Sequence, residues 1–262
     1  MFRLYENAFS PFARKIRLVL EHKGLAFETV DGLALANRDR LEKVNGRVEV
    51  PVLEHDGLVV VNSADIVAYL ERVAPERPVY PREPAAYVAA RAWERCADGF
   101  VDPILVDLSY WIWAERADSR PEAWVTAGRK DLDLVYAALE RDLEGRDFLC
   151  GELSIADIAL YPHLTGTKLL GVTYDAERFP RVHAWQKRLR SMPLFAADLE
   201  RTKAYLTEVA SGGGDTIERR KIFWRGDRIE WLLGHGFHDW LVGEIREGRV
   251  IFPGPAIPSP TR

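Results

Sequence analysis

The sequence predicts an α/β domain built on a mixed sheet, followed by an all-helical domain. Strand and helix patterns alternate from residue 1 to about residue 78. From about residue 85 to residue 209, only patterns of helical length follow one another. Four prolines lie between the two regions, as is typical of a linker: Pro75, Pro78, Pro81 and Pro84. We therefore expect domains of residues 1–78 and 85–209, and a separate aromatic-rich extension of residues 210–262.

The first half of the α/β region has clear local patterns. Residues 2–5 alternate between apolar and polar side chains, which favours a strand. Ser10 and Pro11 suit the N-cap and the first position of a helix, and Gly24 is placed to end that helix. A second strand is expected over residues 26–30.

The second half of this region predicts a short helix, a hairpin and a longer helix. The short helix is expected over residues 38–44. The hairpin is expected over residues 50–61, because an Asp-Gly turn at 56–57 separates two apolar runs. Asn62 and Ser63 then cap a helix with one apolar face.

Five helical segments are expected in the all-helical domain. Pro103, which follows Asp102, should bend or break the first of them. Ser154 and Asp157 before an apolar run resemble a capping box, with Asp in the place of the usual Glu or Gln. The expected helices are 85–115, 120–144, 154–170, 180–191 and 195–209.

The extension is too rich in aromatic residues to be typical of a disordered tail. It begins with a Ser-Gly run at 211–214, which is typical of a flexible linker. Helices are expected over 228–233 and 238–247, followed by an extended segment at 249–252. The proline-rich end, 253–260, is expected to be extended. We expect this tail to pack across the body, to cap a cleft, or to form part of a subunit interface.

The composition excludes some classes of partner and compartment. The net charge of −4 gives no electrostatic reason to expect nucleic acid or an anionic membrane as a partner. The chain has no signal-peptide pattern at its start and no apolar run of about 18 residues. Its only cysteines, Cys96 and Cys150, are far apart, which fits a reducing compartment. We therefore expect a cytoplasmic protein.

Several motifs, in this order and spacing, resemble those of the glutathione transferase superfamily. Residues 4–28, LYENAFSPFARKIRLVLEHKGLAFE, are similar to the opening of the serine-type, tau-like group, and to the omega-like opening with serine in place of cysteine. Residues 50–53 match the family's Val-Pro-hydrophobic-Leu element, in which the proline is cis. Residues 62–66 resemble its Glu/Gln-Ser-x-x-Ile element, and two later segments, 148–163 and 179–195, match its later helices. The resemblance covers about residues 1–209, so the extension lies outside the usual pattern.

This resemblance implies a thioredoxin-like N-terminal domain, an all-α C-terminal domain and a homodimer. It implies an enzyme that activates the thiol of its co-substrate, glutathione, for attack on a small hydrophobic electrophile, as in detoxification. Two alternatives stay open: a non-catalytic relative that keeps the fold for binding, and a glutathione-dependent isomerase. The Ser-Ser-Cys opening of the isomerase group is absent here.

Ser10 is the candidate catalytic residue. A thiolate is the reactive form of glutathione, and it needs a hydrogen-bond donor and a positive potential nearby. Ser10 stands where a strand meets a helix, so its hydroxyl and the helix N-terminus would supply both. The alternative is that Ser10 serves only as an N-cap. No His-and-acid partnership is visible that would make it a nucleophile.

The glutathione-binding candidates also follow from the resemblance. Val50, before Pro51, would offer its backbone to the cysteinyl part, and Ser63 with Asn62 would bind the γ-glutamyl carboxylate. Glu49 stands where the family often has Lys, Arg or Gln, and Asn62 replaces the usual Glu or Gln. Arg47 lies two residues before Glu49, on the same side of an extended chain, and would compensate for its charge.

Aromatic residues are the candidates for an electrophile pocket between the domains. Phe9 and Trp111 are assigned to this pocket, with an aromatic core as the alternative for either residue. The histidines at 235 and 238 have a short spacing but no neighbouring cysteine, so we expect no metal site.

Overall fold

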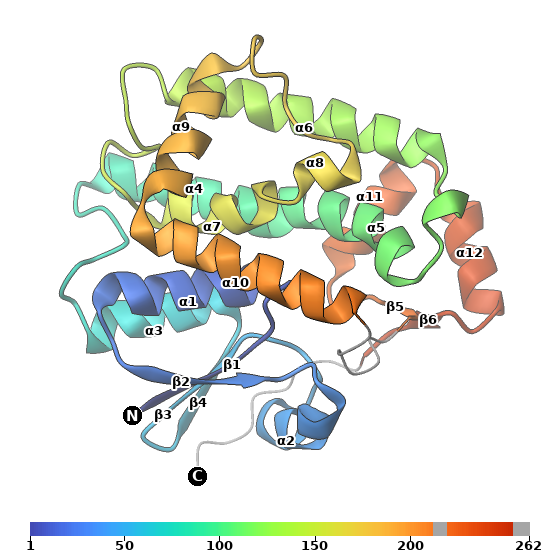
Figure 1. The fold of residues 1–262 in the computed structure, drawn as a ribbon, viewed down its shortest axis with the longest axis horizontal. Coiled ribbons are helices and arrows are strands. Elements are labelled where there is room, and N and C mark those ends of the chain that lie inside the picture. Colours follow the sequence, from blue (N-terminus) through green and yellow to red (C-terminus); the bar gives the residue numbers. More distant parts are fainter. Residues whose placement is uncertain (212–218, 254–262) are drawn as a thin grey trace.

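A computed structural model describes residues 1–211 and 219–253 (Figure 1). Its larger sheet has four strands in the order β2-β1-β3-β4. They are β1 (Phe2–Glu6), β2 (Phe27–Asp31), β3 (Val52–His55) and β4 (Leu58–Val61). The β1–β2 pair is parallel and the other two pairs are antiparallel. The predicted mixed sheet and its hairpin are thus confirmed.

Three helices accompany this sheet: α1 (Pro11–Lys23), α2 (Leu35–Asn45) and α3 (Ser63–Val73). Figure 1 shows α1 and α3 between the sheet and the helical part of the molecule. Several positively charged residues of helix α1 are buried. The helix contacts α3, α7 and α10. Gly24 ends α1 in the left-handed region, with φ of 71°, as its position predicts.

The helical part differs from the predicted segments at two places. The first expected helix is interrupted by a π-helical turn, which separates α4 from α5. The expected helix 154–170 is divided into α7 and α8. Just before the break, the carbonyl of Pro162 accepts hydrogen bonds from the side chains of Arg14 and Thr165. The elements are α4 (Pro84–Cys96), the π turn (Ala97–Val101), α5 (Asp102–Trp113), a 3₁₀ turn (Ala117–Ser119), α6 (Glu122–Asp142), α7 (Ile155–Leu164), α8 (Thr167–Leu170), α9 (Pro180–Ser191) and α10 (Pro193–Ala210).

The capping box predicted at the start of α7 is confirmed. The Ser154 hydroxyl accepts a hydrogen bond from the backbone of Ala156, and Asp157 accepts one from the backbone of Ser154. The other carboxylate oxygen of Asp157 accepts hydrogen bonds from the backbone of Leu149 and from the Trp185 indole, at 3.1 and 2.8 Å. This buried aspartate therefore ties α7 to α9 as well as starting its own helix.

The extension folds onto the helical part. Its elements are β5 (Lys221–Ile222), α11 (Gly226–Gly234), α12 (His238–Arg246) and β6 (Val250–Ile251). The two predicted helices are confirmed, and the extended segment at 249–252 contains β6, which pairs in parallel with β5. Helix α11 packs against α5, and Trp231 and Leu241 belong to the same buried cluster as the core of the helical part. Most of the predicted linker at 211–214, and the end of the chain from 254, lie outside the described residues.

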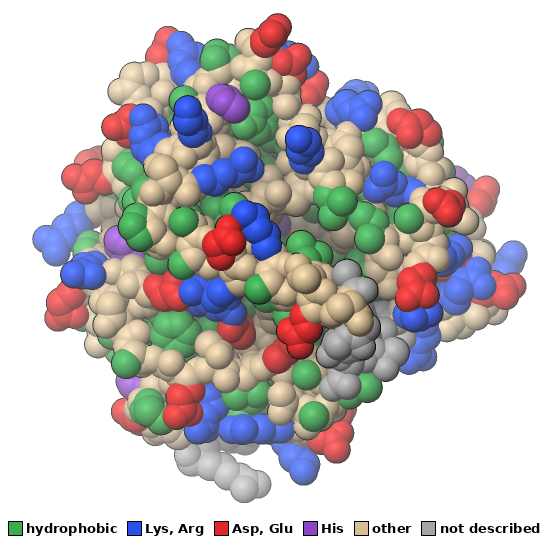
Figure 2. Space-filling view, in the orientation of Figure 1, with side chains coloured by type: hydrophobic (Ala, Val, Ile, Leu, Met, Phe, Trp, Pro, Cys, Tyr) green, Lys and Arg blue, Asp and Glu red, His purple; other side chains and the backbone are tan. Residues whose placement is uncertain are grey.

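The surface mixes charges of both signs. Figure 2 shows basic and acidic side chains interspersed over the visible face, with small apolar areas between them. This distribution agrees with the low net charge of the sequence. Within the described ranges, no helix is long and apolar enough to cross a membrane.

Candidate functional site

Strand register places the three predicted binding elements at one edge of the sheet. Tyr5 of β1 pairs with Val52 of β3, and Val52 pairs with Val61 of β4. The loop after β1, the segment before β3 and the residues after β4 therefore leave the sheet at the same edge. Ser10, Val50 and Ser63 lie in these three segments, within four residues of the strand ends.

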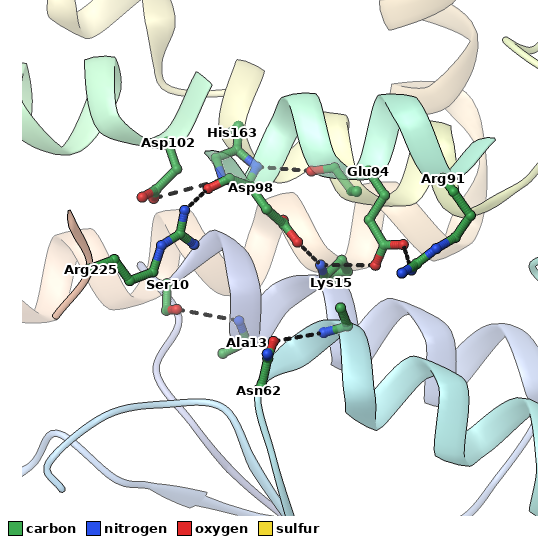
Figure 3. A network of polar contacts seen from close by, with 12 residues as sticks. Ser10, Ala13, Lys15, Asn62, Arg91, Glu94, Asp98, Asp102, His163 and Arg225 are labelled. Atoms are coloured by element: carbon green, nitrogen blue, oxygen red, sulfur yellow. Dashed lines mark hydrogen bonds and ion pairs between the residues drawn. The ribbon is translucent and has the colours of Figure 1, made fainter. Parts of the chain in front are cut away.

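Ser10 is the N-cap of α1, as predicted. Its Oγ accepts a hydrogen bond from the backbone N–H of Ala13 at 3.3 Å, which Figure 3 shows. The residue is only half-buried. Among the residues that the structure describes, none accepts a hydrogen bond from the hydroxyl of Ser10. The same hydroxyl therefore caps the helix with a lone pair, while its proton is free to be donated beside the positive end of α1.

The Val50–Pro51 peptide bond is cis, as the resemblance implies. Both residues are buried, and Val50 packs in a small cluster that includes Ala13 of α1 and Leu41 of α2. Helix α1 and Val50 thus share one small apolar cluster, which holds the start of this helix and the segment before β3 in the same part of the fold.

Asn62 and Ser63 begin α3. Asn62 is the N-cap, with φ of 68°, and its side chain accepts a hydrogen bond from the backbone of Ala64 at 3.2 Å. Asparagine tolerates this left-handed conformation better than most residues. Ser63 is buried at the first helical position, so its backbone N–H belongs to the helix N-terminus. A carboxylate would be favoured there.

Arg47 and Glu49 form an ion pair, which agrees with their predicted placement on one side of the chain. The distance between Arg47 Nη2 and Glu49 Oε2 is 3.2 Å. The same Nη2 also donates to the carbonyl of Trp224, a residue of the extension, at 3.1 Å. Burial raises the pKa of Glu49, while the charges of Arg47, Arg228 and Arg225 oppose that rise. The extension therefore reaches the segment that precedes the cis peptide.

The structure separates the two residues assigned to the electrophile pocket. Phe9 lies in the loop before α1 and is half-buried, with its ring edge-to-face against Tyr205 of α10 at 4.8 Å. Trp111 is only 2% exposed and packs against Trp124 and Trp240. The assignment of Trp111 to an open pocket was wrong, because the extension covers this face of α5 and makes it an aromatic core. The assignment of Phe9 stays a prediction.

A buried polar network behind Ser10 escaped sequence reasoning. Lys15 on α1 lies 3.2 Å from Glu94 and 2.6 Å from Asp98, which belongs to the π turn (Figure 3). Arg225 of the extension donates to the carbonyl of Asp98. The residues next to Lys15 in the sequence give no sign that it is buried, because its partners lie about 80 residues away. This network joins α1, the π turn and the extension.

Other polar residues near the site are paired locally. Asn7 donates to Tyr205 at 2.8 Å and to Asp31 at 3.1 Å, which orders the loop before Ser10. His235 lies 3.1 Å from Asp131 and is part of the extension's packing on α6. Within residues 1–211 and 219–253, no three His, Cys, Asp or Glu side chains are grouped as a metal site would require.

Comparisons with known proteins agree with this architecture. The description "Glutathione S-transferase, N-terminal domain" matches residues 4–78, and "Glutathione S-transferase, C-terminal domain" matches residues 122–188. Glutathione S-transferase U7 of Arabidopsis thaliana is 28% identical over 187 residues, which cover 69% of this chain and 78% of that protein. A Caenorhabditis elegans protein named probable maleylacetoacetate isomerase is 24% identical over 200 residues, covering 74% of this chain and 91% of that protein.

Among solved structures, a glutathione S-transferase from Rhodospirillum rubrum F11 has a TM-score of 0.65 with this chain at 28% identity. The match covers 74% of this chain and 90% of that one. Both domain descriptions, in the expected order, and the shared fold agree with a mixed sheet followed by a helical part. The chain belongs to the glutathione transferase superfamily.

Proposed function

We propose that the protein is a glutathione transferase that binds glutathione as a co-substrate and activates its thiol with Ser10. The observation that carries this proposal is the convergence of Ser10, Val50 and the start of α3 at one sheet edge. The Ser10 hydroxyl would donate to the sulfur, and the N-terminus of α1 would favour its anionic form. Val50 would pair with the cysteinyl backbone, and Ser63 with the γ-glutamyl carboxylate.

The chemistry then follows from the lowered pKa of the bound thiol. The thiolate sulfur attacks an electrophilic carbon, a carbon–sulfur bond forms, and the leaving group departs or the negative charge moves onto the acceptor. We propose a small hydrophobic electrophile, since Phe9 and Phe12 are half-buried aromatic residues beside Ser10. We also propose a cytoplasmic homodimer with a role in detoxification. The resemblance supports the dimer and the role, and the scarcity of cysteine supports the compartment.

Replacement of Ser10 tests the activation. Ser10→Ala should lower kcat with a chromogenic activated aryl halide by about 10- to 100-fold, since a hydrogen bond to a charged group contributes about 1.5–3 kcal/mol. Glutathione affinity, measured by calorimetric titration, should change much less. The pKa of the bound thiol, followed by the ultraviolet absorbance of the thiolate, should rise by about one to two units.

Two further variants separate activation from capping. Ser10→Thr keeps both a hydroxyl and an N-cap, so it should retain most of the activity. Ser191→Ala removes an exposed hydroxyl that bonds only its own helix, so it should behave as the wild type. An unchanged turnover in Ser10→Ala would show that Ser10 is only a cap.

The second candidate function is non-catalytic binding, and Glu49 is the observation that favours it. Its carboxylate precedes the cis peptide, where it would repel a carboxylate of a bound peptide thiol. In that case glutathione titration would show no binding at millimolar concentration. An isomerase would bind glutathione but would not consume it, so thiol titration during turnover distinguishes it from a transferase.

A further inference from the structure

The segment Trp224–Arg228 of the extension, here called the tail segment, lies against three elements around the candidate site. The carbonyl of Trp224 accepts from Arg47, just before the cis peptide. The guanidinium of Arg225 lies over the ring of Phe12, at 5.0 Å from its centre, and bonds the carbonyl of Asp98. Figure 3 shows Arg225 above Ser10, beside Asp98 and Asp102. The tail segment is thus part of the surroundings of Ser10.

Three arginines meet at the tail segment: Arg225 and Arg228 belong to it, and Arg47 donates to its Trp224 carbonyl; they are here called the arginine cluster. Arg47 pairs directly with Glu49 at 3.2 Å, and the charges of all three arginines oppose the rise in the pKa of Glu49. Arg228 is 6% exposed, and its Nε and Nη2 each lie 3.0 Å from Asp102. Its guanidinium also lies over the ring of Trp224. These contacts hold Arg228 in one orientation against the start of α5.

Two N–H groups of this cluster have no partner. Within the described part of the chain, nothing accepts a hydrogen bond from Nη1 of Arg228 or from Nε of Arg47, and both atoms are buried. Leaving a buried donor of a charged group unpaired is costly, so native structures rarely do so without a reason. An anionic group bound at the predicted peptide-binding edge would supply an acceptor for these donors.

We propose that Arg228, together with Arg47, binds the glycyl carboxylate of glutathione, so that the extension completes the co-substrate site. This inference rests on the proposed function. With the thiol at Ser10, the cysteinyl backbone at Val50 and the γ-glutamyl end at Ser63, the other end of the peptide lies on the Glu49 side of Val50. Arg47 pairs with Glu49 on that side, and Trp224 lies between Arg47 and Arg228, in contact with both.

The cluster also accounts for the unusual glutamate before the cis peptide. Arg47 and Glu49 neutralise each other, and Arg225 is paired with Asp227. Arg228 shares its charge with Asp102, but its planar fork keeps a free edge, which suits a carboxylate. A positive charge from the extension would therefore replace the charge that a basic residue at position 49 would supply.

The test compares glutathione with its glycyl ethyl ester, which lacks only this one charge. Calorimetric titration of the full-length wild-type chain should show about tenfold or more tighter binding of the acid than of the ester. In Arg228→Gln this preference should fall to about twofold or less. Because both ligands are measured on the same variant, a general loss of structure would weaken both and leave their ratio unchanged. Arg219→Gln, which removes an exposed arginine of the extension, should keep the wild-type ratio.

A conservative variant keeps the test valid if the loss of an ion pair unfolds the chain. Arg228→Lys retains a positive charge next to Asp102 but loses the guanidinium fork, so its preference should be intermediate. Binding of acid and ester with equal affinity by the wild type would overturn the inference and leave the transferase function intact. If both Arg228 variants kept the wild-type ratio of affinities for the acid and the ester, the inference would also be overturned and the transferase function would stay intact. Absence of any glutathione binding to the wild type would instead remove the proposed function itself.

Discussion

The two regions that meet at the candidate site are held in different ways. The sheet edge places Ser10, Val50 and Ser63 through strand register, helix N-termini and a cis peptide, all of which are backbone features. The tail segment is placed by side chains: Arg228 bonds Asp102, 126 positions away in the sequence. The part of the site that the backbone positions should keep its geometry when the pH or a single charge changes. The part that ion pairs position should not.

Aromatic packing attaches the extension even without these ion pairs. Trp124 of α6 stacks on Phe237 at 4.8 Å and meets Trp240 at 4.7 Å, so the far part of the extension is anchored by apolar area. The charges near β5 and α11 set the orientation of the tail segment. Substitution of these charged residues should therefore loosen the tail segment and leave the sheet edge unchanged.

The largest effect is expected from the buried pair of Lys221 and Asp107. Both side chains are at most 1% exposed, and Lys221 also lies over the Tyr110 ring. Lys221→Met leaves Asp107 buried without its counter-charge, which should lower the free energy of unfolding by about 3–5 kcal/mol. Urea unfolding measures this loss.

The matched control replaces both members of that pair. Lys221→Met with Asp107→Leu removes the uncompensated charge, and such double replacements are often neutral. The double variant should therefore recover most of the stability. If it is as unstable as the single variant, the loss comes from packing rather than from the buried charge.

A smaller, pH-dependent effect is expected from Glu244 on α12. Burial opposes its ionisation, but hydrogen bonds from Arg249 and Arg116 outweigh burial and lower the pKa of Glu244 to about 2. A carboxyl with a lowered pKa stabilises the folded state above its unfolded pKa of about 4.5, and this contribution is lost as the pH falls toward 2. Glu244→Gln should cost about 1–2 kcal/mol at neutral pH.

The difference between Glu244→Gln and the wild type should shrink as the pH falls below about 4.5. Glu247→Gln is the control, because Glu247 is exposed and its carboxylate comes no closer than 3.5 Å to the Arg249 guanidinium. It should change stability by less than about 0.5 kcal/mol. A constant difference between Glu244→Gln and the wild type at all pH values would exclude the ionic explanation.

Local sequence patterns predicted the backbone-held region well. Ser10-Pro11 as a helix start and Gly24 as its end depend on residues within a few positions, and so does the capping box at Ser154 in the helical part. The mixed sheet follows from the alternation of such elements. The division of the chain at residues 78 and 85, and the ligand contacts of Ser10, Val50 and Ser63, stay predictions, because no bound ligand defines them.

The side-chain-held region was hidden from the sequence because its contacts are distant. Lys15 and Arg14 look like residues of an exposed helix face, yet both are buried against partners on other helices. Trp111 was assigned to a pocket because the pattern of α5 does not show that α12 covers it. In the extension, Lys221 and Arg228 are buried although nothing in their local sequence indicates it. Periodicity locates such helices but does not identify what they pack against.

The smallest effect is expected from Glu49, and it tests the contact between the two regions most directly. Glu49→Gln removes a negative charge beside the arginine cluster but keeps an oxygen that accepts from Arg47. Binding of glutathione should tighten by about two- to fivefold at neutral pH, since half-exposed charge pairs contribute about 0.2–1 kcal/mol. The glycyl ester should bind the variant and the wild type equally.

The pH dependence of binding separates this charge effect from a change of shape. Burial raises the pKa of Glu49, so in the wild type this carboxyl takes up its proton above its ordinary value of about 4.5. Wild-type affinity should therefore approach that of Glu49→Gln as the pH is lowered into this range, while the ligand's own carboxylate is still ionised. Weaker binding to Glu49→Gln at neutral pH would mean that Glu49 orients Arg47 more than it repels the ligand. The arginine before the cis peptide would then depend on its glutamate in the way that Arg228 depends on Asp102.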